Sequence, residues 1–126
     1  MHNVALWKEA GEFEFFVSSQ GADSSLIEPV SFDERIKVPV AKLEGYVNSK
    51  IKMLKLEAEG AEPEILEGLG EKLKFIEYIS ADLGYERGVA CESTLVPVTN
   101  YLLERGFELV DVSHERIGAL YKNKAL

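Results

Sequence analysis

Short apolar runs separated by polar turns dominate the first part of the chain, and this pattern predicts strands. Val4–Trp7 and Phe13–Val17 are apolar or aromatic runs joined by a polar turn, so we expect them to form an N-terminal β-hairpin. The polar residues 18–25 follow as a loop, and Ile36–Val40 reads as another short strand. Leu43–Val47 is long enough for one or two helical turns.

From residue 51 onward the pattern predicts alternating strands and helices. In chain order, we expect a strand at Ile51–Ala58, a helix at Pro63–Leu69, a strand at Phe75–Ala81, a helix at Leu95–Arg105, and strands at Phe107–Val112 and Ile117–Lys122. Pro63 suits the first helical position, and Ser93 or Thr94 can cap the second helix. The alternation predicts an α/β fold with a mainly parallel sheet. The last two strands are joined too closely for a parallel crossover, so they should form an antiparallel pair.

Charge and composition narrow the classes of partner. Lys and Arg number 14 against 22 Asp and Glu, and the resulting net charge of −8 disfavours nucleic acid or an anionic membrane as the main partner. The single cysteine, Cys91, fits a reducing, cytoplasmic location. No apolar run approaches the roughly 20 residues of a membrane span. Without repeats or linkers, residues 1–126 are expected to form a single domain. His2 and His114 lack metal-ligand spacing, so no metal site is expected.

The segment Lys55–Gly68 (KLEAEGAEPEILEG) carries the clearest candidate chemistry. In open α/β sheets, ligands bind beyond the carboxyl ends of strands. Here a strand ends at Glu57 and Glu59, and Gly60 lets the backbone turn tightly into the following helix. A carboxylate at the position of Glu57 can bind an amine or hydroxyl, or accept a proton as a general base. The alternative for such an acid is a solvated side chain without a chemical role.

Other polar residues have structural interpretations beside the functional ones. Asp82 follows the strand Phe75–Ala81 on the same rim as Glu57, where it can face a substrate or simply close a turn. For Tyr85–Arg87 we favour pairing with one another over contact with a substrate. Three glutamates at the helix start suit solvent or the positive end of the helix dipole: Glu62, Glu64 and Glu67.

Lys55–Gly68 also resembles the central motif of the FkbM family of S-adenosylmethionine-dependent methyltransferases, K-I-D-V-E-G-A-E-x-x-V-L-x-G. The matching residues are Lys55, Glu59, Gly60, Ala61, Glu62, Leu66 and Gly68. Glu57 stands where the family has aspartate, which keeps the charge and moves it outward by one methylene. Weaker landmarks match in order on both sides, including Ser24-Ser25-Leu26 and Ser80-Ala81-Asp82, so the resemblance covers nearly the whole chain.

The resemblance implies a partial doubly wound, Rossmann-like methyltransferase sheet with an antiparallel C-terminal strand pair. The implied reaction is methyl transfer from S-adenosylmethionine to an oxygen nucleophile of a small-molecule acceptor, such as a sugar or natural-product hydroxyl. Glu57 is the implied base or orienting group, with Asp82 as the second catalytic candidate. The implied cofactor-binding residues are Asp23, Ser24, Ser25, Glu57, Glu59 and Gly60. Loop propensity alone also explains Asp23, Ser24 and Ser25.

The family's first two strands, with their glycine-rich turn and ribose-binding acid, have no counterpart in this sequence. We therefore expect a truncated domain that begins at the family's third strand. Without the first strand, Ile51–Ala58 becomes an edge strand with an unpaired backbone, which proteins normally cover. We expect a second copy of the chain, the N-terminal hairpin or a separate partner to cover it. The alternative function is a non-catalytic α/β module that assembles through this edge.

Overall fold

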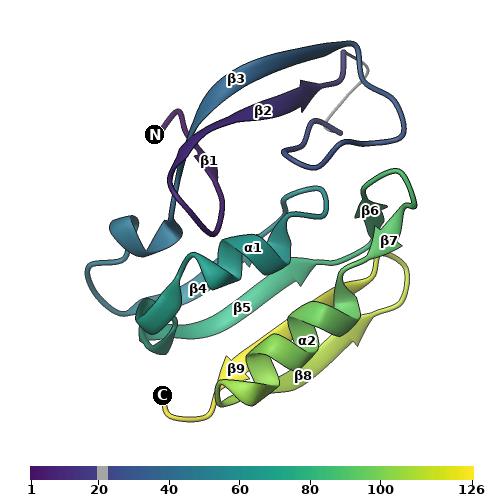
Figure 1. Ribbon diagram of the computed structural model, residues 1–126. Coiled ribbons are helices and arrows are strands. Elements are labelled where there is room, and N and C mark those ends of the chain that lie inside the picture. Colours follow the sequence, from purple (N-terminus) through teal and green to yellow (C-terminus); the bar gives the residue numbers. More distant parts are fainter. Residues whose placement is uncertain (20–22) are drawn as a thin grey trace.

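The chain folds as an α/β structure with mixed sheets and few helices (Figure 1). The computed structural model describes residues 1–19 and 23–126. The strands are β1 (Ala5–Leu6), β2 (Gly11–Val17), β3 (Glu34–Ala41), β4 (Ile51–Leu56), β5 (Ile76–Asp82), β6 (Tyr85–Arg87), β7 (Glu92–Ser93), β8 (Phe107–Ser113) and β9 (Gly118–Asn123). The helices are α1 (Glu62–Glu67) and α2 (Leu95–Glu104), with short 3-10 helices η1 (Leu43–Tyr46) and η2 (Gly70–Phe75).

The central sheet has the strand order β4-β5-β9-β8. The expected alternation of strands and helices after residue 51 is confirmed, and so is the antiparallel pairing of the last two strands. The sheet is nevertheless mixed rather than mainly parallel. Only β4 and β5 pair in parallel, because β9 inserts between β5 and β8 and runs antiparallel to both.

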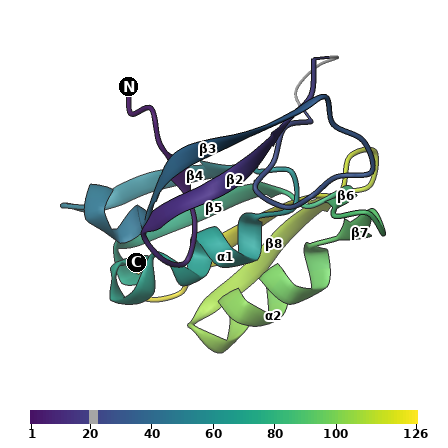
Figure 2. The same ribbon diagram turned by 45° about the horizontal axis from the view of Figure 1, so that its top comes forward.

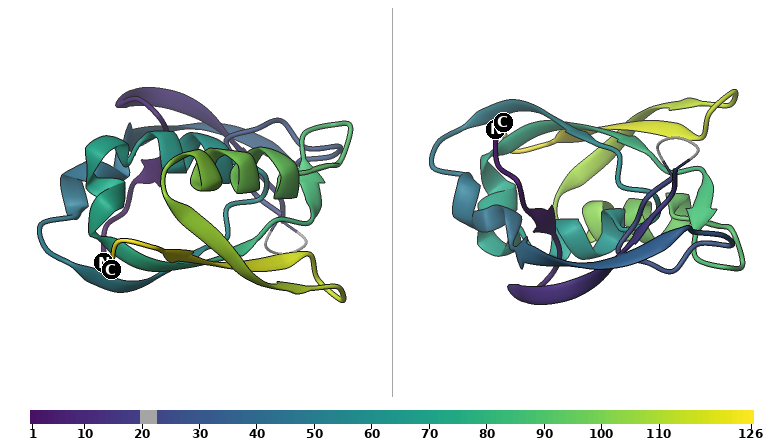
Figure 3. Two further views of the ribbon diagram at one scale, coloured as in Figure 1. Left: turned by 90° about the horizontal axis from the view of Figure 1, so that it is seen from below. Right: turned by 90° about the horizontal axis from the view of Figure 1, so that it is seen from above.

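The hydrophobic core lies between this sheet and its two helices. Figure 3 shows α1 and α2 on the same side of the four-stranded sheet. The fully buried side chains of the core include Ile79 on β5, Tyr121 on β9, Leu66 on α1 and Leu102 on α2. The buried Tyr121 hydroxyl shares a hydrogen bond of 2.7 Å with Thr99, so its polar end is satisfied. None of the helices in the described part of the chain is long and apolar enough to cross a bilayer.

The N-terminal strands form a separate sheet with the order β1-β3-β2. The predicted hairpin between the first two apolar runs is wrong, since β2 pairs antiparallel with β3 and β1 pairs parallel with β3. The physical reason is length: β1 offers two pairing positions, whereas β3 pairs with all seven residues of β2. Figures 1 and 2 show this sheet beside β4 and α1, on the side away from β8.

β4 lies at the edge of the central sheet, as expected. The N-terminal strands pair among themselves and add no strand to this edge, so the expected covering of β4 does not come from strand pairing with them. Met53 at the middle of β4 is 49% exposed in the single chain. Pairing of β4 with a second copy or a separate partner stays a prediction.

Small shifts at the element ends change the position of candidate residues. β4 ends at Leu56, so Glu57 lies just past the strand. α1 begins at Glu62, which places Pro63 one residue further into the helix than expected. At the start of α2, Thr94 occupies the cap position, but the hydroxyl that accepts a hydrogen bond from the Leu95 N–H belongs to Ser93 (3.2 Å).

Candidate functional site

The site is built on the turn that joins β4 to α1. Glu59 and Gly60 both have left-handed backbone conformations, with φ of 50° and 97°. Gly60 also packs against the backbone of β6, where a Cβ atom on it would lie only 2.5 Å from the Arg87 Cα. Glycine is therefore required at position 60 by conformation and by space. A left-handed glutamate is uncommon, and such strain is found where the surrounding structure fixes the backbone.

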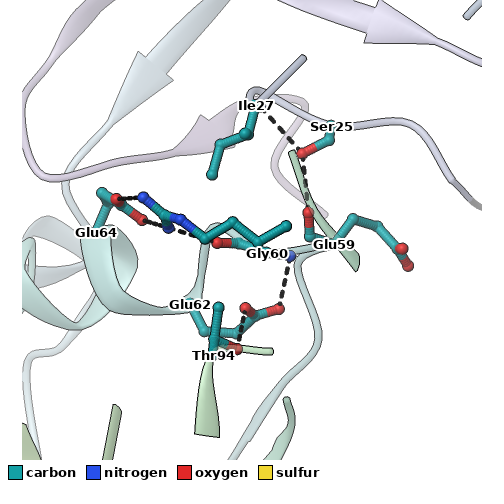
Figure 4. A network of polar contacts seen from close by, with 8 residues as sticks. Ser25, Ile27, Glu59, Gly60, Glu62, Glu64 and Thr94 are labelled. Atoms are coloured by element: carbon teal, nitrogen blue, oxygen red, sulfur yellow. Dashed lines mark hydrogen bonds and ion pairs between the residues drawn. The ribbon is translucent and has the colours of Figure 1, made fainter. Parts of the chain in front are cut away.

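Glu62 holds this turn from inside the protein (Figure 4). Its Oε1 accepts hydrogen bonds from the N–H groups of Ala58 (2.9 Å) and Gly60 (3.2 Å), and its Oε2 accepts one from the Thr94 hydroxyl (3.0 Å). Only 1% of Glu62 is exposed. The expectation of a solvated or dipole-stabilising glutamate is thus wrong for Glu62, because three donors replace its water.

Arg87 on β6 holds the same turn from the opposite side. Its Nη1 donates to the Gly60 carbonyl (2.7 Å), and its two terminal nitrogens donate to the two carboxylate oxygens of Glu64 (2.8 and 2.6 Å). The Glu64 side chain is buried in this bidentate pair, so the expected solvated role is wrong for Glu64 as well. The expected pairing of Arg87 with its own neighbours is also wrong, whereas Glu67 is exposed as expected.

A pocket of about 370 Å³ opens between this turn and the N-terminal sheet, within the usual size range of ligand sites. Its walls come from β1, β2, the loop after residue 22, the turn and α1. The lining residues are Ala5, Leu6, Phe15, Ser24, Ser25, Leu26, Glu57, Ala58, Glu59, Ala61 and Ile65. Ser24, Ser25, Glu57 and Glu59, which were predicted to bind cofactor, are therefore brought together here.

The predicted serines also have structural partners. The Ser25 hydroxyl donates to the Glu59 carbonyl (3.2 Å) and accepts from the Ile27 N–H (3.1 Å), which ties the loop to the turn. The Ser24 hydroxyl accepts from the Ser18 N–H (3.0 Å). Of the other two predicted cofactor residues, Gly60 lies in the turn behind the lining, and Asp23 is exposed beside it.

Acidic side chains around the pocket alter one another's ionisation. Burial raises the pKa of Glu59 to about 7, with further contributions from a hydrogen bond to the Glu86 side chain and from repulsion by Glu86, Asp23 and Glu57. The pKa of Glu86 is raised as well, mainly by burial. Both carboxyl groups therefore stay protonated to a higher pH than an isolated glutamate does. Glu86 was missed as a site residue, because its partner Glu59 lies far away in the sequence.

The two predicted catalytic acids lie in different surroundings. Glu57 lines the pocket, is 42% exposed at its side chain and forms an ion pair with Lys55 at 3.2 Å. Asp82 does not line the pocket. Its carboxylate accepts from the Gly84 N–H (3.4 Å) and lies 3.8 Å from Arg116. Asp82 is close enough to raise the pKa of Glu86, so it belongs to the outer part of the same acidic group.

Metal ligation has no geometric basis in residues 1–19 and 23–126. In that part of the chain, no group of three or more His, Cys, Asp or Glu side chains is placed to hold a metal ion.

Comparisons with models of known protein families, with curated proteins and with solved structures find no significant match to this chain.

Proposed function

We propose that the chain is an S-adenosylmethionine-dependent methyltransferase domain of the FkbM type, acting on a hydroxyl group of a small molecule. The observation that carries this proposal is the pocket at the carboxyl end of β4. Four of the six residues that the motif resemblance assigns to the cofactor come from two distant segments and line that one pocket: Ser24, Ser25, Glu57 and Glu59. Ser25 and Glu59, 34 residues apart, are also joined by a hydrogen bond.

The topology of the central sheet supports the same proposal. The parallel pair β4-β5 is continued by an antiparallel final strand, β9. Such an arrangement agrees with the closing part of the doubly wound sheet that the resemblance implies. The pocket lies beyond the carboxyl end of β4, where open α/β sheets bind their ligands.

The residues of the pocket fit the cationic and apolar parts of the cofactor. S-adenosylmethionine supplies an electrophilic methyl group on a positively charged sulfonium. Glu57 and Glu59 offer carboxyl groups to positive charge, and none of the described lining residues is Lys or Arg. Phe15 and Ile65 provide apolar surface for a ring system.

Glu57 is the residue to which we assign the acid–base role. When a hydroxyl oxygen takes the methyl group, the carbon–sulfur bond breaks, an oxygen–carbon bond forms and the hydroxyl proton must leave. A half-exposed carboxylate on the pocket wall can accept that proton or hold the hydroxyl in position. Asp82, held by Arg116 outside the pocket, stays the second candidate.

Isothermal titration calorimetry of the chain with S-adenosylmethionine tests the proposal. We expect a dissociation constant in the micromolar range and a loss of at least about tenfold in affinity for Glu57→Ala. The matched control is Glu67→Ala, which removes an exposed glutamate of the same segment and should bind like the wild type. Absence of binding at millimolar ligand would refute a cofactor site in this pocket.

A second candidate function is a non-catalytic module that assembles through β4. The open edge of β4 and the 49% exposure of Met53 favour it. Light scattering on the purified chain distinguishes the two functions. The module is supported by a stable dimer whose formation does not depend on S-adenosylmethionine. The Leu54→Pro variant, in which proline blocks strand pairing at β4, should then be monomeric. A monomer at high concentration argues against it.

A further inference from the structure

Two adjacent residues of β6 contact the turn that carries Glu59. Arg87 donates to the Gly60 carbonyl at 2.7 Å, and the Glu86 carboxyl group lies close enough to Glu59 to raise its pKa. The β6 backbone also packs so closely on Gly60 that no side chain fits there. β6 therefore forms a wall directly behind the turn, although it adds only three residues of strand and pairs only with β7.

Three polar backbone groups at the centre of the turn are held by side chains (Figure 4). Ser25 binds the Glu59 carbonyl, Glu62 binds the Gly60 N–H, and Arg87 binds the Gly60 carbonyl. The hydrogen bonds from the Gly60 N–H to Glu62 and from Ser25 to the Glu59 carbonyl are both long, at 3.2 Å. The Arg87 bond is shorter and charge-assisted, and the Arg87 guanidinium is itself fixed by the bidentate pair with Glu64.

We propose that Arg87 is a positioning residue of the pocket: it joins the Gly60 carbonyl to the Glu64 carboxylate and thereby fixes the left-handed turn from which Glu59 reaches the pocket wall. Its role in binding S-adenosylmethionine rests on the proposed function. Its role in placing Glu59 does not, and can be measured on the chain without ligand.

A lysine at position 87 keeps the charge and loses the planar fork that spans two acceptors. In Arg87→Lys, the turn is no longer joined to α1 through one rigid group, and Glu59 gains freedom to leave Glu86. The carboxyl groups that face Glu59 are Glu86 from β6, Asp23 from the preceding loop and Glu57 from its own turn. Since burial and these neighbours raise the pKa of Glu59, displacement of Glu59 lowers that pKa.

Carbon-detected NMR titration of the glutamate carboxyl groups reads this displacement directly. In the wild-type chain, Glu59 should titrate near 7, and in Arg87→Lys its pKa should fall towards the ordinary value of 4.5. Glu64→Gln, which weakens the anchor of Arg87 and leaves the Gly60 bond, should shift it in the same direction by less. Arg105→Lys is the matched control, because Arg105 stacks on Tyr101 away from the turn and should leave Glu59 unchanged.

Three results would overturn the positioning role. These are a wild-type Glu59 that titrates near 4.5, an unchanged Glu59 titration in a folded Arg87→Lys chain, and loss of the folded state in both Arg87→Lys and Glu64→Gln. The last result would make the ion pair a requirement of the whole fold rather than of the turn. Backbone amide spectra of β5 and β9 report on that fold.

Calorimetry then separates this role from the proposed function. If the wild-type chain binds S-adenosylmethionine, Arg87→Lys should bind about tenfold more weakly, and Arg105→Lys should bind normally. If the wild-type chain does not bind it, the methyltransferase proposal fails, while the Glu59 titration still decides whether Arg87 positions the turn.

Discussion

Removal of the buried Glu62 carboxylate should be among the most destabilising single changes in this chain. Glu62 accepts hydrogen bonds from two backbone N–H groups and one hydroxyl, and its side chain is almost fully buried. Glu62→Ala leaves these three donors without an acceptor. An unsatisfied buried group costs about 1–3 kcal/mol, and water entering the space recovers part of this, so we expect a total loss of about 3–5 kcal/mol. Domains are typically stable by about 5–15 kcal/mol, so the variant should be close to unfolding.

Urea unfolding followed by the fluorescence of Trp7 measures this loss, since Trp7 packs against the core. Two matched variants separate the contributions of the individual hydrogen bonds to this loss of stability. Glu62→Gln keeps an acceptor oxygen for the two amides and should cost about 1 kcal/mol, and Thr94→Val removes only the hydroxyl bond and should also cost about 1 kcal/mol. If Glu62→Ala lost less than about 1 kcal/mol, the carboxylate would not hold the turn and the reasoning would be refuted.

Two further predictions concern neighbouring residues of the turn. The folded-state pKa of Glu59 is raised to about 7 from 4.5, so its stabilising proton is fully held below about pH 4.5 and lost as the pH rises to 7. The stability of Glu59→Gln relative to wild type should therefore increase across that interval, by about 1 kcal/mol after discounting for solvent screening. If the free energies of unfolding of the two chains, measured with urea, changed in the same way from pH 4.5 to 8, this prediction would be contradicted. Gly60→Ala should cost about 2–4 kcal/mol in the same assay, because its Cβ meets the Arg87 backbone at a positive φ, whereas Gly45→Ala, with open space around it, should change stability by less than about 0.5 kcal/mol.

The fold could be predicted where the signals are local. After residue 51, apolar runs, helix caps and short connections lie within a few residues of each element, and the alternation they indicate is confirmed. The insertion of β9 between β5 and β8 depends on which strand edge is free after the helices pack, and no local pattern carries that information. The N-terminal hairpin failed for a related reason. The polar turn next to Gly11 is a good local signal, but the strand that pairs with β2 is β3, which begins only at Glu34.

For the site, too, local sequence signals predict some residues correctly and fail where the deciding contact is distant in the sequence. Glu62 and Glu64 have the sequence pattern of solvated acids at a helix start, and only their distant partners reveal otherwise. Thr94 is 32 residues from Glu62, and Arg87 is 23 residues from Glu64. The family resemblance alone indicates a cofactor role for Ser24 and Ser25, whereas the position of Glu57 and Glu59 at a strand end also indicates a site. Their meeting in one pocket depends on residues 24–26, which lie beside the turn and are distant from it in the sequence.

The acidic residues of the segment 57–67 differ in burial, and substitutions at them should therefore affect different properties of the protein. Glu62 and Glu64 use their carboxylates on internal donors, and Glu67 faces solvent. Glu57 and Glu59 remain as the acids of this segment that reach the pocket. A change at Glu62 should thus lower stability first, and a change at Glu57 should lower ligand affinity with little loss of stability. Because these residues share one motif, the acidic motif serves both to fix the turn, through Glu62 and Glu64, and to present carboxyl groups to a ligand, through Glu57 and Glu59.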